Sequence, residues 1–89
     1  MELQLISGTF TIAEAEELLT AIFKTKIAFH EQKVKTIHDS EEDIKHSEKK
    51  IMLLQERLRD AIKKLKENGQ THTSLHAHIE VSTMPRLHQ

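Results

Sequence analysis

Residues 9–68 contain neither glycine nor proline, because the two glycines of the chain are Gly8 and Gly69 and its single proline lies further on. An uninterrupted block that is rich in Glu, Lys, Leu, Ile and Ala favours helix through the propensities of its residues. This block therefore restricts the chain to a mainly α fold.

Both ends of the block carry helix-boundary signals. Thr11 followed by Glu14 has the spacing of a capping box, in which the hydroxyl and the carboxylate each bond a free backbone N–H of the first turn. Asn68-Gly69 at the other end suits a left-handed C-cap. We therefore predict that the helical region covers residues 11–68.

The stretch around Asp39 decides whether this region forms one helix or two. Asp39 with Glu42 resembles a second N-cap. Against a break, an apolar row with the heptad spacing of a coiled coil runs straight through the stretch, at Ile37, Ile44, Ile51, Leu58 and Leu65. In the neighbouring row of the same helix, however, serines occupy positions where a coiled coil needs apolar residues. We favour an antiparallel two-helix hairpin with helices over about 12–38 and 40–67, and one long coiled-coil helix remains the alternative.

Folding the chain about Asp39 brings apolar positions together along the hairpin. Val34 then lies opposite Ile44, and Ile27 lies opposite Ile51. We expect eight residues at the helix–helix interface, namely Ile27, Val34, Ile44, Ile51, Leu54, Leu58, Ile62 and Leu65. The apolar stripe of the first helix covers about half of the helix circumference, so it can contact a second element besides its partner helix.

The segments that flank the helices read as short β-strands. Residues 70–83 alternate between an apolar face with Leu75, Ala77, Ile79 and Val81 and a polar face that includes His72, His76 and His78. The N-terminal segment places Met1, Leu3 and Leu5 on one side. In a hairpin the two segments meet at the same end and run in opposite directions, so they can pair antiparallel, within one chain or between two. We predict a single domain over residues 1–89, with an N-terminal strand at 1–10, the hairpin at 11–68, a C-terminal strand at 70–83 and a tail at 84–89.

Composition limits what this fold can do alone. A chain of 89 residues with 37% hydrophobic content and three aromatic residues buries only a thin core. We therefore expect a homo-dimer with a four-helix arrangement. The N-terminal apolar run is too short for a signal peptide, and no segment reaches the roughly 20 apolar residues of a membrane helix. A cytoplasmic protein without membrane contact is the expectation.

The C-terminal strand holds the candidate metal ligands. His76, His78 and Glu80 share its polar face, and imidazole and carboxylate groups bind zinc, nickel or copper. The competing interpretation is a solvated strand face, whose histidines also make it responsive to pH, and we favour the solvated face. His30 near the middle of the first helix is interpreted in the same way, as a core histidine rather than a general base.

The second helix is basic but mixed in sign. Its cations alternate with carboxylates, no aromatic side chains stand among them to stack on bases, and the net charge of the chain is −1, so nucleic-acid binding is not favoured. No phosphate-binding glycine loop or nucleophile motif occurs, and we expect neither catalysis nor a cofactor. The leading hypothesis is a non-enzymatic, self-associating protein that acts in protein–protein interaction or as a scaffolding or accessory subunit. A metal- or pH-responsive module and a nucleic-acid accessory protein are the alternatives.

Two short motifs give a resemblance. Residues 5–11 read L-I-x-G-x-F-T before the helix, and residues 26–30 read K-I-x-F-H. Through these two motifs, the first third of the chain (3–33) resembles small uncharacterised bacterial proteins. The resemblance implies a helical-hairpin fold and gives weight to Phe29 and His30, and it carries no activity that can be transferred.

Overall fold

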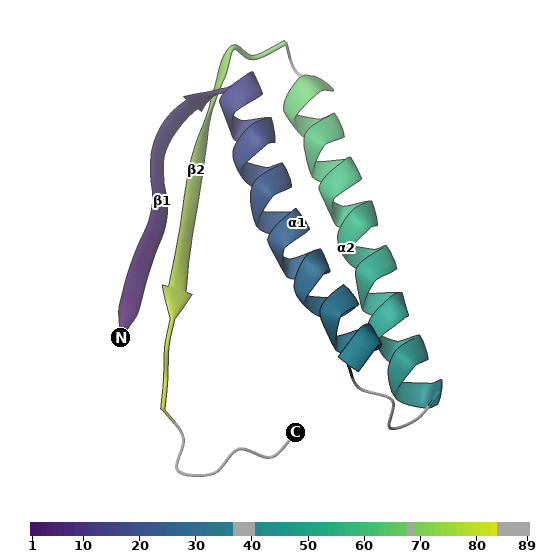
Figure 1. The fold of residues 1–89 in the computed structure, drawn as a ribbon. Helices are drawn as coiled ribbons and strands as arrows, with labels where there is room; N and C mark the ends of the chain where they lie inside the picture. The colour runs from purple at the N-terminus through teal and green to yellow at the C-terminus, as the bar shows by residue number, and fades with distance from the viewer. Residues whose placement is uncertain (37–40, 68, 84–89) are drawn as a thin grey trace.

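The computed structural model describes residues 1–36, 41–67 and 69–83. The order of elements is β1 (Glu2–Thr11), α1 (Ile12–Thr36), α2 (Glu41–Glu67) and β2 (His72–Glu80). Figure 1 shows α1 and α2 side by side and antiparallel, with the two strands on the other side of α1. The predicted hairpin is confirmed and the single long helix is wrong. The turn at Asp39 and the predicted boundaries at 38 and 40 lie outside the described residues.

The junction of β1 and α1 is set by the predicted capping box. The backbone N–H of Thr11 donates to Glu14 Oε1 at 2.9 Å, and the N–H of Glu14 donates to Thr11 Oγ1 at 3.1 Å. Because both bonds satisfy groups that a helix start leaves free, the chain passes from strand to helix without a loop. This contact fixes where the ribbon leaves the hairpin.

The far end of α2 is joined back to the start of α1. Gly69 adopts φ +62, the left-handed conformation that glycine accepts without a Cβ penalty. Lys66 Nζ lies 3.3 Å from Glu16 Oε2 of α1. This ion pair is largely exposed and therefore contributes little, but it shows that the ends of the two helices lie level.

The strands form one two-stranded antiparallel ribbon within the chain. Thr11 is opposite His72 at the closed end and Glu2 is opposite Glu80 at the open end. The first strand is displaced by one residue from the predicted range 1–10, because it ends at Thr11. The second strand is shorter than the predicted range 70–83 at both ends. Beyond them, Met1 and Val81 still exchange two hydrogen bonds.

The prediction that Leu5 continues the row of Met1 and Leu3 is wrong. The register shifts between Gln4 and Ile6, which leaves Leu5 without an opposite residue. A bulge of this kind inserts one residue and resets the alternation. Ile6 opposite Ala77 therefore follows Leu3 opposite Ile79 on the apolar face.

The chain buries very little of itself. Among the described residues, the buried hydrophobic side chains are Ala15 at 0% exposure and Leu54 at 7%. The other seven residues expected at the helix–helix interface are half-buried: Ile27, Val34, Ile44, Ile51, Leu58, Ile62 and Leu65. The Cα atoms extend over 47 × 30 × 15 Å. The molecule is therefore flat, with its shortest extent about a third of its longest.

Candidate functional site

The polar face of the ribbon carries the predicted metal ligands. The residues opposite His76, His78 and Glu80 are Ser7, Gln4 and Glu2. Ser7 Oγ lies 3.2 Å from His76 Nδ1, which occupies one ring nitrogen. Residues two apart on a strand are about 6.7 Å apart, so His76 and Glu80 are separated by about 13 Å. Metal–ligand bonds of about 2 Å do not bridge that span.

The structure accordingly assembles no three-ligand group in this region. Within residues 1–36, 41–67 and 69–83, no three His, Asp or Glu side chains gather closely enough to hold an ion. His76 and His78 are neighbours on one exposed face, and Glu80 lies beyond them. Metal binding by this set stays a prediction.

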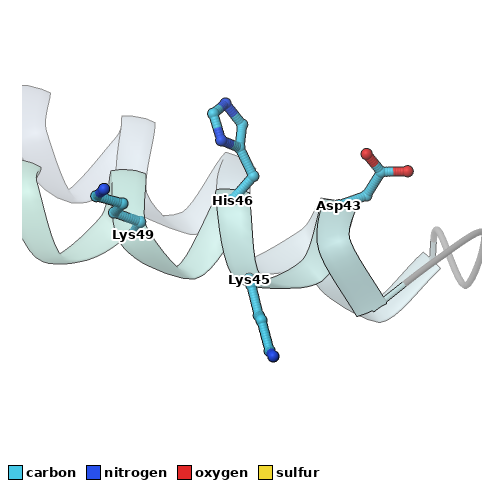
Figure 2. A pocket seen from close by; sticks show the side chains of 4 residues that line it. All are labelled: Asp43, Lys45, His46 and Lys49. Atoms are coloured by element: carbon cyan, nitrogen blue, oxygen red, sulfur yellow. The ribbon is translucent and has the colours of Figure 1, made fainter.

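A surface hollow on the outer side of α2 is lined by Asp43, Lys45, His46 and Lys49. Figure 2 shows His46 and Lys45 pointing to opposite sides of the helix. All four side chains come from successive turns of one helix, and nothing from α1 or the ribbon is among them. We see no convergent chemistry there.

A different hollow lies between the two helices and brings positive charges together. It measures about 340 Å³ and is lined by Lys26 and His30 of α1 and by Lys50, Leu53, Leu54 and Arg57 of α2. None of these lining residues is acidic. In the described part of the chain, Lys26, Lys50 and Arg57 have no ion-pair partner. We call this group the basic hollow.

The pKa of His30 is affected by the cations around its ring. Removal from water is the main effect that lowers the pKa of His30, and the positive charges of Lys50, Lys26 and Lys33 lower it further. Its ring also meets Phe29 edge-on with centroids 5.7 Å apart. The half-buried imidazole is therefore held neutral at physiological pH in a positive field.

The ribbon and α1 diverge away from their junction (Figure 1), and large apolar side chains on both remain exposed. Leu18 shares a hollow with Phe10 of β1, so this face of α1 is turned to the ribbon. Three turns further on, the same face carries Phe29, which is 57% exposed. On the ribbon, Leu3, Ile79 and Val81 are 48%, 46% and 41% exposed. We call Leu3, Phe29, Ile79 and Val81 the open apolar surface.

Sequence reasoning missed the basic hollow, although a signal for it was present. Lys50 and Arg57 are one heptad apart and so share a face of α2. The predicted pairing of Ile27 with Ile51 also placed Lys26 opposite Met52, within one helical turn of Lys50. Interpreting each helix separately as a solvated charged face hid this meeting of cations from both helices.

Comparison with known proteins adds no assignment, because no family model matches the chain and no curated protein or solved structure is significantly similar to it. The resemblance of residues 3–33 to small bacterial proteins therefore stays a prediction. Neither helix, within the described residues, combines the length and apolar character needed to span a bilayer.

Proposed function

We propose that this protein is a non-enzymatic, self-associating module, whose homo-dimer is the unit that takes part in protein–protein interaction or scaffolding. The observation that carries the proposal is the near absence of a core, with Ala15 and Leu54 the buried hydrophobic residues of the described chain. Stable domains pack two layers of secondary structure around a core. The flat chain, with a shortest Cα extent of 15 Å, buries little between its elements, and a second copy packed on it completes the core.

The surface area supports this proposal. The accessible surface is 7558 Å², whereas a compact monomer of 10.3 kDa exposes about 5,400 Å². The excess is larger than the roughly 600–1,000 Å² that each partner buries in a stable dimer, so the chain has enough surface for such a contact.

The open apolar surface is where we place the contact. Its four residues lie on α1, on the two strands and just beyond the end of β2, and covering them removes apolar area from water at about 25 cal/mol per Å². The two helices and the ribbon of each protomer stay as they are. The predicted four-helix arrangement follows if the helices of the two copies stack.

Light scattering on the eluting peak of a size-exclusion column tests the proposal. We expect a dimer at micromolar concentration. Phe29→Glu is expected to weaken the dimer at least tenfold, since a charge then sits in an apolar contact, with each tenfold step worth about 1.4 kcal/mol. Met52→Glu is the control, because Met52 on α2 is 63% exposed and outside the surface. A well-folded wild-type monomer at 100 μM would overturn the proposal.

A further inference from the structure

The basic hollow concentrates positive charge that nothing in the described chain neutralises. Lys26, Lys50 and Arg57 line one cavity of about 340 Å³ together with His30. Elsewhere, Lys66 is paired with Glu16. Like charges held together repel each other, so three unpaired cations around one hollow raise the affinity for an anion there.

The number and spacing of these cations indicate the kind of anion. Lys50 and Arg57 are about 10 Å apart along α2, and Lys26 and His30 are about 6 Å apart along α1, at 1.5 Å per residue. Because lysine and arginine carry their charges on long flexible stems, the three cations can converge on one ligand, and three positive charges favour an anion with several negative charges over a singly charged one. The volume of the hollow is at the lower end of the range for small-molecule sites, about 300–1,000 Å³.

The chemistry of the lining residues also suits phosphate. Arginine presents a fork of N–H donors that fits phosphate oxygens in pairs, and lysine contributes a point charge on a flexible stem. Leu53 and Leu54 form an apolar part of the lining. Leu54 closes one side of the hollow, whereas the three cations are exposed to solvent, so their attraction for an anion depends on the salt concentration.

We infer that the basic hollow between α1 and α2 is a binding site for a compact polyanion with two or more linked phosphate groups, held by Lys26, Lys50 and Arg57. Lys26, Lys50 and Arg57 do not belong to the open apolar surface, whose Phe29 meets the hollow at the ring of His30. The inference therefore holds for a monomer or a dimer, and its failure leaves the proposed self-association untouched.

Isothermal titration of the full chain with pyrophosphate and with tripolyphosphate tests the site, with inorganic phosphate as the single-group comparison. At low salt we expect saturable one-site binding that is at least tenfold tighter for tripolyphosphate than for inorganic phosphate. Raising the salt is expected to weaken it, as for any partly exposed charge contact. Absence of saturable pyrophosphate and tripolyphosphate binding at low millimolar concentration would overturn the inference.

Paired variants separate the hollow from general surface charge. Lys50→Gln/Arg57→Gln is expected to reduce tripolyphosphate affinity at least tenfold, and the control Lys45→Gln/Lys49→Gln removes the same charge from the hollow that α2 alone lines (Figure 2). Equal losses in the two variants would show non-specific attraction and would refute the site. Circular dichroism confirms that each variant keeps its helices.

A second readout reports from inside the hollow. The ring protons of His30, followed by NMR through a pH titration, give its pKa with and without tripolyphosphate. An anion bound among the cations offsets the positive field that now lowers the pKa of His30, so the pKa is expected to rise on binding. A short single-stranded oligonucleotide is the other arm. If it binds through Lys50 and Arg57 while tripolyphosphate does not, the compact-polyanion inference fails.

Discussion

Leu54 is the large side chain on which the hairpin depends most, and replacing it with alanine tests the account of the fold. It is 7% exposed on α2. Leu→Ala at a buried site costs about 2–5 kcal/mol, with the lower values where the surroundings collapse into the space. The neighbours of Leu54 are half-buried and able to move, so we expect about 2–3 kcal/mol from the lower part of that range.

That loss is a large share of the total free energy of unfolding of a protein of this size. Proteins of this size have unfolding free energies of about 4–13 kcal/mol at 0.05–0.15 kcal/mol per residue. A loss of 2–3 kcal/mol corresponds to a fall in Tm of roughly 10–20 °C for a domain of fewer than 100 residues. Leu54→Ala is therefore expected to be clearly destabilised but still folded at room temperature.

Urea unfolding at one fixed protein concentration measures the effect, because self-association makes the midpoint depend on concentration. Met52→Ala is the matched control. Met52 lies on the same turn of α2 but is 63% exposed, so its truncation is expected to change stability by less than about 0.5 kcal/mol. Equal effects of the two substitutions would refute the position of the helix–helix interface described above.

Three further results are expected. Thr11→Ala removes a capping hydroxyl and should cost about 1 kcal/mol of stability, whereas Thr25→Ala removes only a bond to a carbonyl inside α1 and should be near neutral; urea midpoints compare them. Because the pKa of His30 is lowered in the folded state, its contribution to stability is present at high pH and is lost as the pH falls below about 6.5, so His30→Gln should show a flatter profile between pH 7.5 and 5. Zinc calorimetry should give at most weak binding that His76→Ala/His78→Ala abolishes, and tight binding by wild type would contradict the spacing argument.

The features that the sequence predicts well are the ones encoded locally. Thr11 and Glu14 are three residues apart, and their reciprocal bonds form as soon as the helix starts. Gly69 takes the left-handed conformation where the C-cap pattern placed it. The hairpin itself follows from the apolar seam, which pairs well only if the chain reverses.

The features that it predicts badly depend on register between distant segments. Nothing in the sequence near Leu5 shows that the pairing register of β1 with β2 shifts at this residue. The bulge is defined by pairing with residues that lie at the other end of the chain. The basic hollow likewise exists only once α1 and α2 are aligned. A pattern confined to one helix therefore gives the sign of each charge but not which charges meet.

The uneven burial of the ribbon links the fold to its proposed assembly. At the junction, Phe10 and Leu75 are half-buried, whereas Leu3 and Ile79 at the open end remain about half exposed. An isolated two-stranded ribbon is marginal in water, so its open end gains stability only from a partner. We therefore expect the ribbon amides near Leu3 to exchange with solvent faster as the protein is diluted, while those near Phe10 stay protected. Exchange that is uniform and independent of concentration would show that the ribbon needs no second copy.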